Sequence, residues 1–171
     1  MPFLGNPNEE YDIKVNFKLN ANGNENGGIG IFFETVLETN NNNRDTGYIL
    51  QFDRNFSEII LRKRVLGSES TSQGAALIFR AGNVGTSTII NSNIPHRSNI
   101  SFWETDKEIL IQVRNSGQNN KKLITIYVDS ILIVSSFEID SDIDAVNNHT
   151  GFRAWSNRPA TFYSLEITNI Q

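Results

Sequence analysis

The segment from Ile109 to Ile139, ILIQVRNSGQNNKKLITIYVDSILIVSSFEI, gives the clearest indication of the architecture. Apolar and polar residues alternate over 109–113 and again over 124–128, which is typical of strands with one buried face. A polar loop at 115–122 separates these two strands, and Asp129-Ser130 turns the chain into a third, at 131–138. This pair is a weaker turn signal than Asp-Gly, because serine tolerates positive φ poorly. The stretch predicts a three-stranded antiparallel meander within a large all-β sandwich.

Short strands separated by polar turns occupy most of the remaining chain. We expect them at 13–19, 29–37, 47–53, 58–65, 75–80, 86–91, 151–155 and 161–167. Polar loops are expected at 20–28, 38–46 and 66–74, and 140–149 could form one helical turn. Two sheets can each bury one face against the other, so the sequence predicts a single two-sheet antiparallel domain over 1–171. Residues 1–10 are expected to be a flexible end or the boundary of a longer precursor, and we favour a piece of a longer precursor.

Composition excludes several classes of function. The 171 residues carry a net charge of -4, which argues against a nucleic-acid partner or an anionic membrane surface. No apolar run is long enough to span a bilayer, so we expect no membrane insertion by this chain. Cysteine is absent, which excludes disulfides, thiolate metal sites and cysteine nucleophiles.

Three pairs of segments resemble the concanavalin A-like lectin/glucanase superfamily. The first pair is GGIGIFFE at 27–34 with GYILQFD at 47–53. The second is Trp103 and ILIQV at 109–113 with ITIYVD at 124–129, and the third is GFRAW at 151–155 with ATFYSLEI at 160–167. Within the superfamily, the chain is most similar to laminin-G-like domains related to levan-binding modules and 3-keto-disaccharide hydrolase domains. The resemblance implies a jelly roll of two curved sheets, usually with a sugar-binding concave face.

The chain departs from this family at three places. It has Asp129-Ser130 where Asp-Gly is common, and Asp106-Lys107-Glu108 where a histidine often follows the tryptophan. It also lacks the Glu-x-Asp-x-x-Glu run of the glucanases, which argues against a glycosidase of that kind. Similar domains occur downstream of prepilin-type helices, so the resemblance also implies a pilin-like context in a bacterial surface protein.

Polar and aromatic residues alternate against the expected core positions on several strands. If these strands are neighbours, one sheet displays Gln51, Asp53, Arg62, Arg64, Gln112, Arg114, Tyr127, Arg153 and Trp155. Guanidinium and amide groups form paired hydrogen bonds with vicinal hydroxyls, and an aromatic ring offers an apolar platform for a sugar. Two interpretations stay open: a carbohydrate-binding face, or a solvated outer face with cross-strand ion pairs.

A second group of polar residues has the spacing of metal ligands. Asp140, Asp142 and Asp144 alternate, and carboxylates are the ligands that calcium prefers. The group lacks the glycine and distal glutamate of an EF-hand, and a solvated acidic turn is the alternative. The resemblance adds that the superfamily includes calcium-binding members. Of the two tryptophans, Trp103 is expected in the core, whereas Trp155 could be buried or exposed.

We therefore expect a non-catalytic carbohydrate-binding or adhesion domain of a bacterial cell-surface or secreted protein. The first alternative is a structural head domain of a pilin-like subunit, with pilus or surface-assembly subunits as partners. The second is a glycoside-hydrolase-like enzyme, although no acid–base pair with supporting spacing is visible. The expected location is extracellular or at the cell surface, with no cofactor other than calcium.

Overall fold

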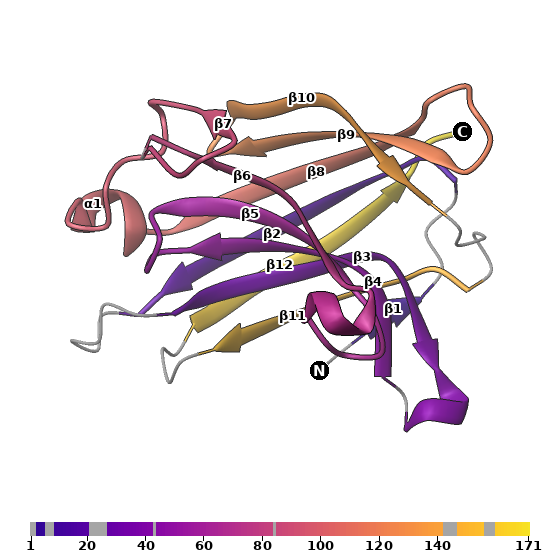
Figure 1. Cartoon of the computed structure of the whole chain (residues 1–171). Helices are drawn as coiled ribbons and strands as arrows, with labels where there is room; N and C mark the ends of the chain where they lie inside the picture. The colour runs from indigo at the N-terminus through magenta and orange to yellow at the C-terminus, as the bar shows by residue number, and fades with distance from the viewer. Residues whose placement is uncertain are drawn as a thin grey trace.

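Two stacked sheets form the structure, a computed structural model that describes residues 3–5, 9–20, 27–42, 44–83, 85–141, 147–155 and 160–171 (Figure 1). Within these residues, sheet A has seven strands in the order β1-β11-β3-β4-β5-β6-β7, and sheet B has five in the order β10-β9-β8-β2-β12. The strands of sheet A are β1 (Phe3–Gly5), β11 (His149–Trp155), β3 (Gly28–Glu38), β4 (Arg44–Asp53), β5 (Glu58–Arg64), β6 (Ala76–Gly82) and β7 (Ile89–Ile90). Those of sheet B are β10 (Ile131–Asp140), β9 (Lys121–Val128), β8 (Lys107–Asn115), β2 (Tyr11–Leu19) and β12 (Ala160–Asn169).

The predicted meander is confirmed as β8, β9 and β10, which are antiparallel neighbours in sheet B. Asp129 and Ser130 both have positive φ, at 50° and 65°, as in the tight turns whose twist matches that of the flanking strands. Asp129 is held there by its own carboxylate, which accepts hydrogen bonds from the Glu108 amide (3.0 Å) and from Lys107 Nζ (2.6 Å). These bonds stabilise the turn although it lacks a glycine.

The core lies between the two sheets, where the alternating apolar residues meet. Every second residue of β2 from Tyr11 to Leu19 is fully buried, as are the inward residues of β8 and β9. Trp103 is also fully buried, as predicted, with its ring 4.6 Å from that of Phe52 and its indole N–H donating to Pro95 O (3.0 Å). The two-sheet antiparallel sandwich is therefore confirmed.

Two local predictions need correction, and one short element was not predicted. The loop expected at 38–46 is shorter, because β3 extends to Glu38 and β4 already begins at Arg44, with a 3-10 turn, η1 (Thr39–Asn41), at the tip. The second of the strands expected at 75–80 and 86–91 is reduced to the two residues of β7, which pair in parallel with β6. Just before the meander lies a one-turn helix, α1 (Ile100–Trp103), which Asn99 caps by accepting the Phe102 amide proton.

Both ends of the described chain are paired in the sheets. Phe3–Gly5 pairs with β11, and β12 pairs with β2 along its whole length. Residues 142–146, in the segment expected to form a helical turn, lie outside the described residues. In the part of the chain that is described, no helix has the length and apolar character needed to cross a membrane.

Candidate functional site

The nine predicted ligand-binding residues are divided between the outer faces of the two sheets. Six lie on sheet A, namely Gln51, Asp53, Arg62, Arg64, Arg153 and Trp155. Three lie on sheet B, namely Gln112, Arg114 and Tyr127. The prediction that one sheet displays all nine is therefore wrong. Alternation tells which side of a strand a residue occupies, but it does not tell to which sheet the strand belongs.

Glu69, in the loop between β5 and β6, joins four polar residues of sheet A. Its carboxylate accepts hydrogen bonds from Arg64 Nη1 (2.6 Å) and Arg153 Nη2, and Gln51 Nε2 lies 3.3 Å from its Oε2. Arg62 Nε donates to Gln51 Oε1 (3.0 Å) and lies 3.6 Å from Glu69 Oε2. We call these five residues the Glu69 cluster. They hold the loop that carries η2 (Thr71–Gln73), magenta in Figure 1, against sheet A.

The Glu69 cluster has a buried end and an exposed end. Arg64 is only 5% exposed, and its guanidinium also donates to both oxygens of Asp45 (2.5 and 3.3 Å) and to Gly67 O (2.6 Å). The side chains of Arg62, Glu69 and Arg153 are 26%, 28% and 29% exposed. Arg153 Nε has no hydrogen-bond partner among the described residues. That Nε is itself buried, so the cluster is open to a ligand only at the partly exposed portions of Arg62, Glu69 and Arg153.

Burial and charge affect the guanidinium groups at this site. Burial and the nearby charge of Arg64 lower the pKa of Arg153. Both side chains also lie over the ring of Phe32, at 5.5 Å for Arg64 and 5.9 Å for Arg153. Cations over an aromatic ring are attracted by its negative face, so these contacts help to keep two like charges side by side.

Trp155 lies next to the Glu69 cluster on a floor of two glycines. A Cβ atom at Gly28 would come within 2.9 Å of its Cζ2, and one at Gly30 within 3.5 Å of its Cζ3. Because glycine has no side chain, the Gly-x-Gly segment of β3, which carried the family resemblance, leaves room for the indole of Trp155 to lie over it. The guanidinium carbon of Arg153 lies 5.7 Å from the indole ring. An aromatic surface and planar hydrogen-bonding groups are therefore side by side.

Asp53, also predicted to bind a ligand, is buried against the β4–β5 turn instead. It is 5% exposed, and its Oδ1 accepts the Phe56 amide proton (3.3 Å) in the β4–β5 turn. Burial raises its pKa to about 6. Its cross-strand neighbour Glu58 has no exposed side-chain surface and pairs with Arg80 at 2.5 Å. In this conformation neither carboxylate can contact a sugar outside the sheet.

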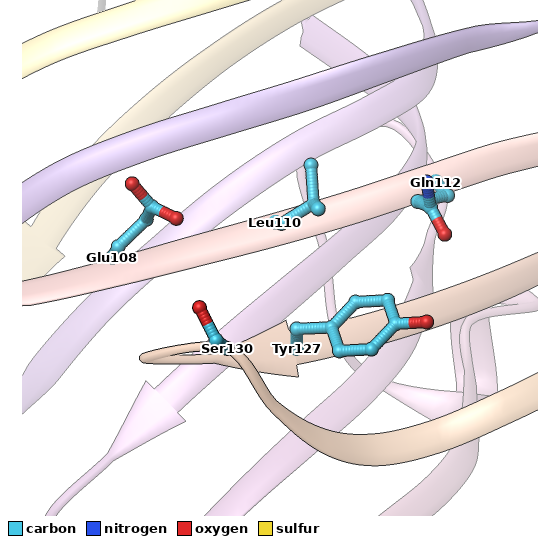
Figure 2. Close-up of a pocket in the computed structure, with 5 residues that line it drawn as sticks. All are labelled: Glu108, Leu110, Gln112, Tyr127 and Ser130. Carbon is cyan, nitrogen blue, oxygen red and sulfur yellow. The ribbon is translucent and has the colours of Figure 1, made fainter.

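The outer face of sheet B carries a separate pocket of about 300 Å³. Its lining residues come from β8, from β9 and from the turn after β9, and are Glu108, Leu110, Gln112, Tyr127 and Ser130 (Figure 2). Leu110 and Tyr127 are cross-strand partners, so their side chains point to the same side of the sheet. Arg114, two residues beyond Gln112, pairs with Asp12 (2.6 Å) and does not line the pocket.

A buried carboxylate, Glu34, ties the two sheets together. It is 1% exposed and accepts hydrogen bonds from Tyr11 Oη (2.5 Å), Asn148 Nδ2 (2.8 Å) and Ser141 Oγ. Burial and the charge of Glu34 raise the pKa of Tyr11 well above its usual value. The adjoining cavity has about 80 Å³, which is small beside the several hundred Å³ of a typical ligand pocket. We interpret these contacts as structural.

The calcium prediction stays a prediction. Asp140 has a 61% exposed side chain and pairs with Lys121 Nζ at 2.5 Å, whereas Asp142 and Asp144 lie outside the described residues. Within the ranges that are described, no three acidic or histidine side chains are grouped as metal ligands. Equal thermal unfolding midpoints in calcium chloride and in chelator would reject calcium binding.

Comparison with solved structures supports the architecture. The chain is similar to carbohydrate-binding module CBM66 from Bacillus subtilis, with a TM-score of 0.55 and 12% identity over 93% of this chain and 74% of that chain. The fold is a concanavalin A-like jelly roll. It is shared by sheep galectin-11, solved with glycerol (TM-score 0.57, 8% identity, 98% and 96% of the two chains). A legume lectin-like domain from Entamoeba histolytica is similar as well (TM-score 0.55, 12% identity, 99% and 76%).

Sequence comparison adds no family to this result. No protein-family model matches the chain, and no curated protein matches it. At 8–12% identity the solved structures show a shared fold. They show nothing about which side chains of this chain bind a ligand.

Proposed function

We propose that this domain binds carbohydrate on the outer face of sheet A, at the exposed end of the Glu69 cluster beside Trp155. The proposal depends on one observation, that the indole on Gly28 and Gly30 lies next to the partly exposed guanidinium of Arg153. Similarity to a carbohydrate-binding module and to lectins supports the same class of ligand.

The chemistry of these groups suits a sugar ring. The indole supplies an apolar surface for the C–H face, while Arg62 and Arg153 donate to ring hydroxyls and Glu69 accepts from them. Shallow sites of this kind combine an apolar platform with a few fixed polar groups, which orient the ligand. Because Glu69 already fixes both arginines, little side-chain ordering is needed when a sugar binds.

Calorimetry with oligomers of glucose, galactose, mannose, xylose and fructose tests the proposal. We expect saturable binding of at least one oligomer, and a tenfold or greater loss of affinity in Trp155→Ala and in Arg62→Gln. Phe56→Ala is the matched control, since Phe56 is 48% exposed and lies in the β4–β5 turn, outside the cluster. Unchanged affinity in both Trp155→Ala and Arg62→Gln, with circular dichroism showing that they fold, would exclude this face.

We also propose that binding occurs without catalysis and outside the cell. The carboxylates of Asp53 and Glu58 are buried and bonded, which supports binding over hydrolysis. Release of reducing ends from the bound oligomer would overturn the proposal that binding occurs without catalysis. The bacterial surface location, the laminin-G-like branch and the attachment to a pilin-like subunit depend only on the sequence resemblance. Fractionation of the source cells tests the location.

A further inference from the structure

The pocket on the outer face of sheet B is built differently from the Glu69 cluster. Its volume of about 300 Å³ lies at the small end of the range for ligand pockets and suits one monosaccharide unit. It lies on the opposite side of the sandwich from Trp155, since the core separates the two outer faces. A ligand bound there would contact none of the Glu69 cluster.

Tyr127 supplies an aromatic surface in this pocket. Figure 2 shows its ring face-on, lying along β9, with the hydroxyl on the side of Gln112. Leu110, its cross-strand partner, continues the apolar surface onto β8. Tyr127 and Ser130 make no side-chain hydrogen bond within the described residues, so both hydroxyls are available to a ligand.

The polar groups around Tyr127 favour an uncharged ligand rich in hydroxyls. Glu108, with a 34% exposed side chain, already pairs with Lys14 at 3.1 Å, and its carboxylate would repel a second one. Gln112 donates weakly to Asp12 (3.4 Å), which leaves its carbonyl oxygen as an acceptor. Carboxylate, amide and hydroxyl groups around an aromatic ring therefore match the alternating hydroxyls and C–H face of a neutral sugar.

We propose that the sheet B pocket is a second carbohydrate site, which takes one neutral monosaccharide unit of a glycan chain. This deepens the proposed function, because it adds a second site for the same class of ligand and depends on that class being right. With one site on each outer face, a single domain binds two glycan segments at once.

Titration of each variant with the oligomers named above, together with oligogalacturonate, tests the second site. In the wild-type chain we expect two binding sites for at least one neutral oligomer. In Tyr127→Ala we expect one site, because affinity at the sheet B pocket falls tenfold or more. We expect oligogalacturonate to bind this pocket with an affinity at least tenfold lower than that of the neutral oligomer. Tyr163→Ala is the matched control, because Tyr163 is 55% exposed on β12 of the same sheet and does not line the pocket.

The outcomes separate this inference from the proposed function. If Trp155→Ala abolishes all binding and Tyr127→Ala changes nothing, the second site is rejected and the sheet A site is retained. If Tyr127→Ala abolishes all binding and Trp155→Ala changes nothing, the sheet A site is rejected and the sheet B pocket is retained. Tighter binding of oligogalacturonate than of neutral oligomers in wild type, lost in Tyr127→Ala, would overturn the assignment to a neutral sugar. Absence of binding to every oligomer rejects both.

Discussion

The outer faces of the two sheets carry similar residue types but use them differently. On sheet A, arginine, glutamine and glutamate side chains bind one another and hold down the loop between β5 and β6. On sheet B, a tyrosine and a serine line a pocket, and their hydroxyl groups have no hydrogen-bond partner among the described residues. The first face is partly a structural layer, whereas the second is open.

The difference shows that composition alone does not identify a binding face. A polar group whose hydrogen bonds are satisfied internally contributes to the stability of the fold, and an unsatisfied one keeps capacity for a ligand. Arg64 and Arg153 belong to one cluster, yet the Arg64 side chain is 6% exposed and bonds Asp45, Glu69 and Gly67, whereas the Arg153 side chain is 29% exposed. We therefore expect substitutions at the buried end of the Glu69 cluster to affect stability, and those at its exposed end or in the sheet B pocket to affect binding.

The largest effect on stability is expected from Arg64→Ala. The substitution leaves Asp45, which is 7% exposed, without its guanidinium partner, and breaking a buried ion pair costs about 3–5 kcal/mol. Arg114→Ala on sheet B is the matched control, because its pair with Asp12 is 31% and 24% exposed and is expected to contribute about 1 kcal/mol or less. Urea unfolding of both variants measures the difference. Equal losses of unfolding free energy would contradict the distinction between the faces.

Asp53→Asn is expected to change the free energy of unfolding by a smaller amount and to raise it. The folded-state pKa of Asp53, raised to about 6, lies above the usual value of 3.8, so the folded protein favours the protonated acid. The stabilisation from this proton is complete below about pH 4 and is lost as the pH rises through 6. Asparagine stays neutral and keeps an acceptor for the Phe56 amide, so it should raise the free energy of unfolding at pH 7.5 by roughly 1–3 kcal/mol.

The pH dependence provides the control for this prediction. At pH 4 the wild-type carboxyl is already protonated in the folded state, so the gain from Asp53→Asn should nearly vanish. Urea unfolding at the two pH values measures it. A gain that is equal at both pH values would show that the burial of charge is not its cause.

The smallest effect is expected at the turn beside the sheet B pocket. Ser130 has a φ of 65°, a region that glycine adopts without strain, so Ser130→Gly should stabilise the fold by about 0.5–1 kcal/mol. The same substitution removes a hydroxyl from the pocket lining and should weaken sugar binding there severalfold. A thermal melt and a titration of one variant thus separate stability from binding. Loss of both together would indicate that the turn itself is disrupted.

Much of the fold could be predicted from the alternation of apolar residues. The period of two over 109–113 and 124–128 identifies strands and their buried sides, because one face of each packs on the core. The helix at α1 was missed, since one turn is too short to show a periodic pattern. The sequence also did not indicate to which sheet each strand belongs, because this depends on pairing between segments far apart in the chain.

The Glu69 cluster could be predicted only in part. Its arginines and glutamine were found from alternation, but Glu69 lies in a polar loop whose sequence does not indicate which side chains it contacts. One signal was available: Ile49 and Ile60 occupy outward positions on their strands and are fully buried. Apolar residues on the outward side of a strand indicate that something covers that face, here the loop and the guanidinium layer.

The pairing of β2 with β12 has a consequence for the order in which the domain can be made. β2 lies between β8 and β12 in sheet B, and Tyr11 at its start is opposite Asn169 at the end of β12. A nascent chain on the ribosome therefore lacks the edge partner of β2 until about 150 further residues have been translated. Contacts of such long sequence separation form slowly, so this jelly roll completes its folding only after β12 leaves the exit tunnel.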